Sequence, residues 1–283
     1  MIVARSVAEL RAAAGGPVSF VPTMGALHEG HASLIRLAAA HGDPVVVSDF
    51  VNPSQFGPHE DFAAYPRDLD GDAALAEAAG AAVLFAPEVA EVYPPGFATA
   101  IDPGPLAAEL CGASRPGHFA GVATVVVRLF GMVRPVRAVF GSKDYQQLVL
   151  MRQVARDLAL GVEIVAAPTV REHDGLALSS RNRYLGAAAR ERAASVPAVL
   201  RAVAVGYADG ARTAAELLDV DALGLELEYL ELRDAELGAF DPARPAVALI
   251  ACRVDGTRLI DNVELDPADP GAALRTFPQE VTA

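Results

Sequence analysis

PVSFVPTMGALHEGHASLIRLAAAHG, residues 17–42, decides the fold of this chain because the spacing of its apolar residues changes within one stretch. The apolar run at 18–21 suits a buried parallel strand, whereas the apolar residues at 34–38 recur at the spacing that gives a helix one apolar face. Gly42 then supplies a helix stop. The stretch therefore predicts a strand, a glycine-bearing loop and a helix.

Small residues and two imidazoles lie in this loop, at Gly25, His28, Gly30 and His31. The start of a helix presents free backbone N–H groups, which attract anions. A neutral imidazole adds one N–H donor, and such donors act most strongly on charge that develops in a transition state. The helix N-terminus disfavours a resting imidazolium, so we expect mostly neutral histidines. The loop therefore predicts a phosphate site.

A zinc site is the other interpretation of HEGH, since the motif superficially resembles metalloprotease helices. Those helices place two histidines four residues apart with two residues after the glutamate. His28 and His31 are one residue too close for that geometry. The spacing therefore disfavours zinc.

Strands and helices continue to alternate through the first half of the chain. Buried strands are predicted at 45–51, 81–87, 138–140 and 162–167. Helices are predicted at 72–79, 121–133 and 142–161, and Ser6 with Glu9 matches a capping box for a short N-terminal helix. This order indicates an α/β fold with a parallel sheet covered on both faces.

The composition changes after Pro168, and we expect a domain boundary there, giving domains 1–169 and 170–283. The polar segment TVREHDGLALSSRNRYL is expected to cross between the domains and to face the first one. A long alanine-rich helical stretch follows at 187–208, which tolerates Pro197 only with a kink or an early end. Alternating strands are predicted at 225–234, 247–254 and 257–265. The pattern indicates a small α+β domain with an antiparallel sheet, and the residues from about Asp266 are expected to be frayed.

The bulk composition excludes several classes of protein. The 283 residues carry a formal net charge of −13, which opposes nonspecific attraction to nucleic acid or to an anionic membrane. Cys111 and Cys252 lack a metal-binding spacing and are expected to be small buried residues. No apolar run is long enough to span a bilayer. These features fit a cytoplasmic protein with small-molecule partners.

Two further groups of polar residues could bind an anion. Lys143 and Asp144 follow a predicted strand, where the carboxyl ends of parallel strands place ligand sites. The ammonium could neutralise a triphosphate, and Asp144 could cap a helix or hold a ribose hydroxyl. LSSRNR at 178–183 groups hydroxyl and guanidinium donors that suit oxyanions.

Uncharged amides at Asn52, Gln55 and Gln147 could bind the hydroxyl and carboxyl groups of a small ligand. Asp49 is unexpected inside the strand predicted at 45–51. A buried unpaired charge is too costly to keep, so Asp49 is expected to face a polar cavity, a partner or a bend.

These motifs together resemble the pantothenate synthetase family over nearly the full length of the chain. HEGH alone is less specific, because it resembles the HIGH box of class I aminoacyl-tRNA synthetases and small nucleotidyltransferases. The matching blocks, in the order of that family, are PTMGALHEGH, FVNPSQFG, EDFAAYPRD, HFAGVATVV, KDYQQL, PTVREHDGLALSSRNRYL and YLELRD.

The resemblance implies an enzyme that joins pantoate to β-alanine with ATP, giving pantothenate, AMP and pyrophosphate through a pantoyl-adenylate. It also implies a Rossmann-like N-terminal domain, a smaller C-terminal lid, a homodimer and Mg²⁺. The 52–71 loop and the second domain are the expected lids over the reactive intermediate.

The resemblance further implies roles for individual residues. His31, as proton donor, His28 and Lys143 resemble the catalytic positions. Gln55 and Gln147 resemble the residues that hold pantoate, and Gln55 also marks where β-alanine arrives; Asn52 and Met24 complete the expected substrate contacts. The positions that resemble the ATP site are Met24, Gly25, His28, His31, Gly141, Lys143, Asp144, Val170, Leu178, Ser179, Ser180 and Arg181.

At three positions, Asp72, Ser142 and Asp49, either this chain or that family has an acidic residue. Only Asp72 aligns with an acidic position that could contact metal. The family commonly has glutamate where this chain has Ser142, and an apolar residue where it has Asp49. Either departure could lower activity, by leaving Lys143 less restrained or by changing the local charge.

Two other functions fit some of the same residues. Another nucleotidyltransferase with a HIGH-type box would form a nucleotide ester, and a non-catalytic nucleotide-binding protein would explain Ser142 and Asp49 as traces of lost catalysis. An aminoacyl-tRNA synthetase is disfavoured, because a chain this short and acidic shows no tRNA-binding module.

Overall fold

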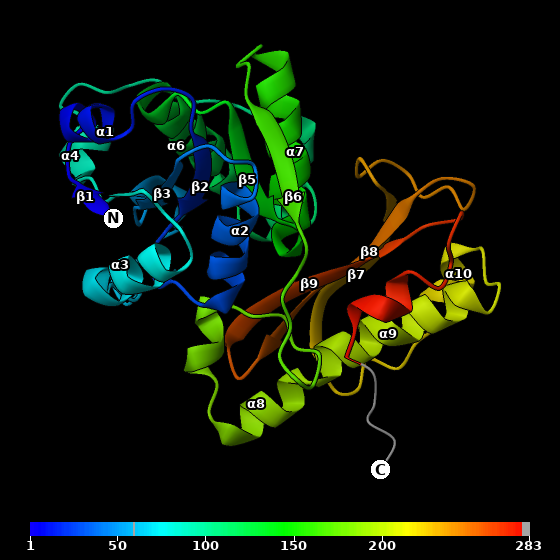
Figure 1. The fold of residues 1–283 in the computed structure, drawn as a ribbon. Helices are drawn as coiled ribbons and strands as arrows, with labels where there is room; N and C mark the ends of the chain where they lie inside the picture. Colours follow the sequence, from blue (N-terminus) through cyan, green and yellow to red (C-terminus); the bar gives the residue numbers. More distant parts are fainter. Residues whose placement is uncertain (59, 279–283) are drawn as a thin grey trace. The chain divides into compact units, whose positions relative to one another are not determined.

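The computed structural model describes residues 1–58 and 60–278, which form two units (Figure 1). The first unit comprises Met1–Ser142 and Gln146–Pro168. The second unit comprises Thr169 onward together with the tripeptide Lys143–Tyr145. The predicted boundary at 169 lies beside this division, but no local pattern indicates that Lys143–Tyr145 groups with the later residues.

A six-stranded parallel sheet forms the centre of the first unit, in the order β1-β4-β3-β2-β5-β6. The predicted α/β class is confirmed. The edge strand β1 was not predicted, because three residues offer too short a pattern. The strands are β1 Ile2–Ala4, β2 Ser19–Thr23, β3 Val45–Asp49, β4 Val83–Phe85, β5 Arg137–Gly141 and β6 Glu163–Ala167.

Helices cover both faces of this sheet, because successive strand residues point to opposite sides. Val21 packs in the same cluster as residues of α2 (Glu29–Ala39) and α3 (Leu69–Ala78). Phe20 instead meets Phe130 of α6 (His118–Val133), with ring centroids 6.2 Å apart. The other helices and turns are α1 Val7–Ala13, α4 Val89–Val92, α5 Cys111–Ser114, α7 Tyr145–Asp157, η1 Pro53–Gln55, η2 Pro105–Ala108 and η3 Ser142–Asp144.

The order in which the chain adds strands to the sheet reverses between β2 and β5: β3 and β4 lie on one side of β2, and β5 and β6 lie on the other. The register that joins these two strands covers only Ser19 with Arg137 and Phe20 with Ala138, although β2 continues to Thr23 and β5 to Gly141. The strands therefore separate toward their carboxyl ends, at the topological switch point where open α/β sheets place their ligands.

The second unit is an antiparallel sheet, β7-β8-β9, with helices packed against it (Figure 1). The predicted α+β class and its three strands are confirmed. The expected kink or early end at Pro197 takes the form of a break before it: α8 ends at Ala193, α9 begins at Ser195, and Pro197 lies in the first turn of α9, where a missing N–H is harmless. The elements are β7 Glu226–Asp234, β8 Ala246–Val254, β9 Thr257–Leu265, α8 Ala187–Ala193, α9 Ser195–Ala208, α10 Ala214–Leu217, η4 Ser180–Tyr184 and η5 Ala273–Thr276.

The expected fraying from Asp266 is wrong for residues 266–278. Ala273 of η5 and Phe277 are buried in the core of the second unit, which fixes this segment. The same prediction for 279–283 lies outside the described residues. Cys111 and Cys252 are buried free thiols, as predicted. Within residues 1–58 and 60–278, no helix combines the length and the apolar character that a membrane span requires.

Candidate functional site

The loop after β2 has a backbone that few residues can adopt. Gly25 has φ +75°, and a Cβ there would lie 2.2 Å from Oδ1 of Asp49, so glycine is required on both grounds. Ala26 follows with φ +51°. Thr23 fixes the start of the loop: its N–H donates to Oγ of Ser48 at 3.1 Å, and its hydroxyl oxygen accepts from the Gly25 N–H.

His28 and His31 together cap the start of α2. Nδ1 of His28 accepts from the Gly30 N–H at 3.1 Å, and Nδ1 of His31 accepts from the His28 N–H at 3.3 Å. The ring centroids are 4.1 Å apart. The prediction that the two imidazoles lie on one side of the helix start is therefore confirmed, and each side chain satisfies an N–H that the helix itself leaves open.

The cap also decides where each ring carries its proton. A ring nitrogen that accepts a hydrogen bond is unprotonated, so a neutral ring whose Nδ1 accepts has its N–H at Nε2. Both rings therefore carry their N–H at Nε2. Two such donors beside a helix N-terminus suit a phosphoryl oxygen.

Asp72 supports the loop from α3. Its Oδ2 accepts from the Ala26 N–H at 2.7 Å, and its Oδ1 accepts from the Leu27 N–H at 2.6 Å. The two bonds hold the residues that lead into His28, and they offset the cost of the left-handed Ala26. Burial raises the pKa of Asp72, although these N–H donors act in the opposite direction.

Asp49 ends β3 and forms a hydrogen bond with Asp72 behind Gly25. Two carboxyl groups in contact cannot both be ionised at low cost, so one proton is shared between them. Burial, together with the charge and hydrogen bond of Asp72, raises the pKa of Asp49 to about 7, while Arg5 acts in the opposite direction. The expectation that Asp49 meets a partner is confirmed.

Gln55 is held by groups from three segments. Its Oε1 accepts from Nδ2 of Asn52 at 2.9 Å, and its Nε2 lies 3.0 Å from Sδ of Met24. Its main-chain oxygen lies 2.9 Å from Nδ1 of His118. The predicted substrate residues Met24, Asn52 and Gln55 are therefore brought together.

Asn52 acts mainly as a support in this group, because it is only 1% exposed and its polar atoms are engaged. Its Nδ2 also contacts the oxygen of Gly121, and its Oδ1 accepts from the Tyr93 hydroxyl at 2.8 Å. The predicted direct contact between Asn52 and substrate stays a prediction. Gln55 remains the group that Asn52 orients.

An ion pair fixes the loop beyond Gln55. Both carboxylate oxygens of Glu60 accept from Arg115 at 2.6 Å, and Nη1 of Arg115 lies 2.8 Å from Nε2 of His118. Burial alone would raise the pKa of Glu60, but the Arg115 hydrogen bonds and charge outweigh it and lower that pKa to about 2. Arg115 and His118 are close together in the sequence, but nothing in their local pattern indicates Glu60 as their partner.

Gln147 was predicted to hold substrate, and it lies half-buried on α7. The adjacent Gln146 has a structural role that the sequence did not reveal. Its Oε1 accepts from the Cys111 N–H, and its Nε2 donates to the oxygens of Leu106 and Glu109. Gln146 therefore binds backbone groups of the 106–111 segment, whereas the adjacent Gln147 is the more exposed of the two glutamines.

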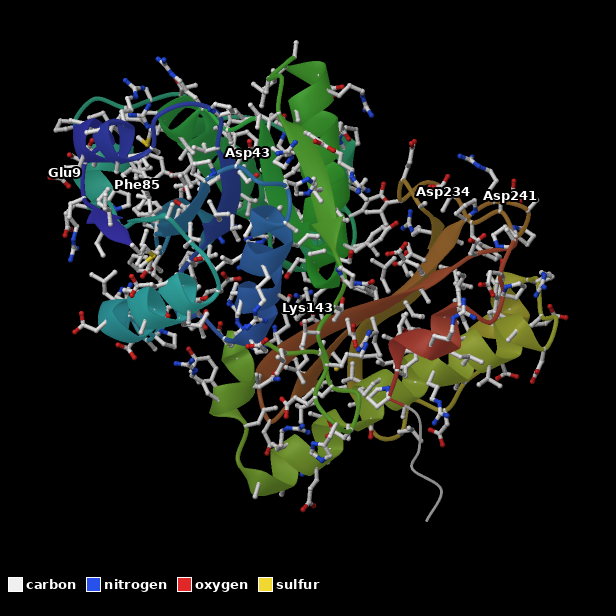
Figure 2. The ribbon with its side chains drawn as sticks, viewed as in Figure 1. Glu9, Asp43, Phe85, Lys143, Asp234 and Asp241 are labelled. Atoms are coloured by element: carbon white, nitrogen blue, oxygen red, sulfur yellow. The ribbon has the colours of Figure 1, made fainter. Side chains whose placement is uncertain are left out.

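Lys143 is the only lysine of the sequence, beside 22 arginines. Its Nζ lies 3.6 Å from Oδ2 of Asp144, and its main-chain oxygen accepts from Nδ2 of Asn262 on β9 at 2.9 Å. The Tyr145 hydroxyl donates to the main-chain oxygen of Ala235, which follows the last residue of β7, Asp234. Figure 2 labels Lys143 and Asp234. Each of these contacts lies within the second unit.

The predicted donors at 170–181 lie in a hairpin at 170–178 and at the start of η4, both in the second unit. The Leu178 N–H donates to the oxygen of Val170 at 3.0 Å, and Arg171 pairs with Ala177. Oγ of Ser179 accepts from the Arg181 N–H and caps η4, which contains Ser180. Val170 and Leu178, both predicted ATP contacts, are thus direct neighbours.

The first unit holds the other predicted ATP contacts at the carboxyl end of its sheet. Met24, Gly25, His28 and His31 follow β2, and Gly141 ends β5 across the switch point.

The predicted metal contact at Asp72 is not supported by the geometry. Both carboxylate oxygens already accept backbone N–H groups. Over the described ranges 1–58 and 60–278, no three His, Cys, Asp or Glu side chains are grouped as metal ligands. The described residues therefore do not form a ready-made Mg²⁺ site, and the metal contact stays a prediction.

Comparison with known proteins connects this geometry to one family. A family model described as pantoate-beta-alanine ligase matches residues 2–264. The pantothenate synthetase of Mycolicibacterium smegmatis is 52% identical over 257 residues, covering 89% of this chain and 82% of that protein. The pantothenate synthetase of Rhodospirillum rubrum is 52% identical over 275 residues, covering 92% of this chain and 98% of that protein.

Solved structures agree with the sequence comparison. The crystal structure of pantothenate synthetase from Thermus thermophilus matches with a TM-score of 0.89 at 48% identity, covering 93% of this chain and 99% of that one. Pantoate-beta-alanine ligase from Francisella tularensis, complexed with beta-gamma ATP and β-alanine, matches with a TM-score of 0.78 at 34% identity, covering 93% and 97%.

Proposed function

The chain belongs to the pantoate-beta-alanine ligase family, and we propose that it condenses pantoate with β-alanine at the expense of ATP, through a pantoyl-adenylate. The products are pantothenate, AMP and pyrophosphate. The observation that carries this proposal is the histidine cap of α2, in which both Nδ1 atoms accept backbone N–H groups and the ring protons lie on Nε2, at the switch point of a parallel sheet.

In the first step, a carboxylate oxygen of pantoate attacks the α-phosphorus of ATP, and the bond from that phosphorus to the pyrophosphate oxygen breaks. Negative charge increases on the phosphoryl oxygens as this happens. We assign His28 and His31 to donate hydrogen bonds from Nε2–H to those oxygens, and each neutral ring keeps its proton throughout the step. No covalent enzyme nucleophile is needed, so positioning supplies much of the rate.

In the second step, the unprotonated amine of β-alanine attacks the acyl carbon. The bond to the adenylate oxygen breaks, AMP leaves and the new amide nitrogen loses a proton. We assign Gln55 and Gln147 to hold pantoate, with Met24 beside them. The fixed position of Gln55, which Asn52 and His118 hold from both ends, supports this role.

Residues of the second unit complete the proposal. Lys143 supplies a compact positive charge for the triphosphate, and the backbone and hydroxyl groups of Val170 and Leu178–Arg181 supply further contacts to the nucleotide. Mg²⁺, which the family resemblance implies, neutralises phosphate charge when it is bound. Such an ion is typically held by the phosphates and water together with few carboxylates.

We further propose that the protein works in the cytoplasm as a homodimer and without nucleic acid. The net charge of −13 supports the last point, and the family resemblance supports the others. Light scattering coupled to size-exclusion chromatography tests this proposal, because a dimer should have twice the 29.4 kDa mass of the single chain.

A pyrophosphate exchange assay tests the function. The purified chain should exchange labelled pyrophosphate into ATP only when pantoate is present and β-alanine is absent. Exchange with CTP but not with ATP and pantoate would favour another nucleotidyltransferase. Nucleotide binding without any exchange or pantothenate synthesis would favour a non-catalytic protein.

A further inference from the structure

Asn262 directs a buried amide at the backbone of the only lysine. Nδ2 of Asn262 donates to the Lys143 main-chain oxygen at 2.9 Å, across 119 residues of sequence. Asn262 lies on β9 and is only 5% exposed. A side-chain amide that is buried and aimed at a main-chain carbonyl fixes the direction in which that peptide points.

A buried ion pair holds the neighbour of Asn262. Arg171 donates to both carboxylate oxygens of Asp261, at 2.6 and 3.1 Å, and the two side chains are 5% and 1% exposed. The same guanidinium donates to the main-chain oxygen of Asn262 at 3.2 Å and lies over the Phe277 ring at 4.7 Å. Arg171 therefore restrains the backbone on which Asn262 stands.

The same arginine also fixes the 170–178 hairpin. Nη1 of Arg171 donates to the oxygen of Gly175 at 3.0 Å, and Arg171 pairs with Ala177 across the hairpin. Val170 and Leu178 flank these residues, and the Leu178 N–H donates a hydrogen bond to the main-chain oxygen of Val170. One strand, β9, thus anchors both Lys143 and the hairpin within the second unit.

Stability alone is a weak reason for such an arrangement. A buried ion pair contributes little net stability, because desolvation of the charges cancels most of their attraction, and apolar residues often serve equally well. A bidentate guanidinium pair does fix an orientation. The groups that it orients here are those assigned above to the nucleotide.

We propose that Asn262 is a positioning residue for Lys143, and that the Arg171–Asp261 ion pair keeps Asn262 and the 170–178 hairpin in one register. The ammonium and the hairpin donors then meet a nucleoside triphosphate as one preformed group. This inference rests on the proposed function for its catalytic consequence, but the positioning itself can be measured without turnover.

A double-mutant cycle tests the catalytic consequence. Asn262→Ala should lower kcat/KM for ATP at least tenfold in the wild-type background and less than twofold in a Lys143→Ala background, because its effect passes through Lys143. Equal losses in both backgrounds would overturn the proposal, since a purely structural role acts on both alike. Asn262→Leu has nearly the same shape without the donor and should reproduce the result if Asn262→Ala folds poorly.

The single lysine allows a second test without activity. An N-hydroxysuccinimide acetate reagent modifies only Lys143 and the Met1 α-amine, and mass spectrometry measures both rates in the full chain. Asn262→Ala should change the Lys143 rate, relative to that of Met1, at least threefold and should weaken the protection that ATP gives. Glu264→Ala, an exposed change on β9, should do neither.

The two tests separate the two proposals. If the wild type synthesises no pantothenate but Asn262→Ala still changes the acylation rate at Lys143, the positioning holds and the function is wrong. If the wild type is active and the acylation rate of Lys143 is the same in Asn262→Ala, the positioning is wrong.

Discussion

The carboxyl groups of Asp49 and Asp72 form a hydrogen bond behind Gly25, and Asp72 also binds the backbone that leads into His28. Asp49 comes from β3 and Asp72 from α3, so the loop between them is supported from two elements. The pair makes the stability of the chain depend on pH.

Asp49→Asn should remove that dependence. Folding raises the pKa of Asp49 from 3.8 to about 7, so the folded chain keeps its proton to higher pH than the unfolded chain. The resulting stability is fully present below pH 3.8 and is lost as the pH rises to about 7. Asp49→Asn mimics the protonated form, so it should match wild type below pH 3.8 and exceed its free energy of unfolding by about 4 kcal/mol at pH 8.

Urea unfolding at pH 5 and pH 8 measures this difference. Arg5, which favours the charged Asp49, and Asp68, which disfavours the charged Asp72, are unchanged in the variant. The exposed Asp70→Asn change on α3 is the control. An equal difference between variant and wild type at both pH values would contradict the shared proton.

Gly25→Ala should cost both stability and activity. The new Cβ would meet Oδ1 of Asp49 at 2.2 Å while the backbone holds φ +75°. Gly16→Ala is the matched control, because Gly16 has φ +95° with open space around it. We expect about 1 kcal/mol and normal activity for Gly16→Ala, but a larger cost and at least tenfold lower turnover for Gly25→Ala. Similar turnover in the two variants would show that the loop shape is unimportant.

His31→Ala should remove both the acceptor that caps the His28 N–H and the Nε2–H assigned to the phosphoryl oxygens, whereas His31→Asn should remove only the Nε2–H. The asparagine oxygen can still accept from the His28 N–H, but the side chain has no Nε2–H. We expect turnover to fall by about 10²–10³-fold in both variants, with the melting temperature lowered mainly in His31→Ala. Near-normal pantothenate synthesis by folded His31→Asn would remove His31 from the mechanism.

Asn52→Ala should raise the KM for pantoate by about tenfold, because Gln55 loses the donor that orients its side chain. Tyr93→Phe removes the hydroxyl contacts to Asn52 and Ser54 but keeps the Asn52–Gln55 bond, and it serves as the control, with a KM within about twofold of wild type. Steady-state kinetics with saturating ATP and β-alanine give both values. An unchanged pantoate KM in folded Asn52→Ala would separate Gln55 from the substrate.

Local patterns predicted the elements that are long and periodic. The strand, loop and helix at 17–42 were predicted because the apolar spacing changes there, and the three antiparallel strands because they alternate. The segment after Asp266 was misjudged, because its order depends on Phe277, a single aromatic residue that packs in a distant core. Sequence spacing alone does not show where such a residue packs.

The site was predicted where its residues lie close together in sequence. His28 and His31 form one motif, and their contact follows from helical spacing. Asp72 meets the loop across 46 residues, and Arg171 meets Asp261 across 90, so no local pattern indicates either contact. The ligand that each of these residues binds stays a prediction.

The grouping of Lys143–Tyr145 with the later residues limits how the protein can be dissected. A fragment that ends at Pro168 would retain this tripeptide but lose Asn262 and Ala235, the two partners that fix its backbone and its tyrosine. A fragment that begins at Thr169 would keep the partners without the tripeptide. Neither piece is a self-contained module, and a screen of the isolated N-terminal fragment for inhibitors would present the lysine without its native support.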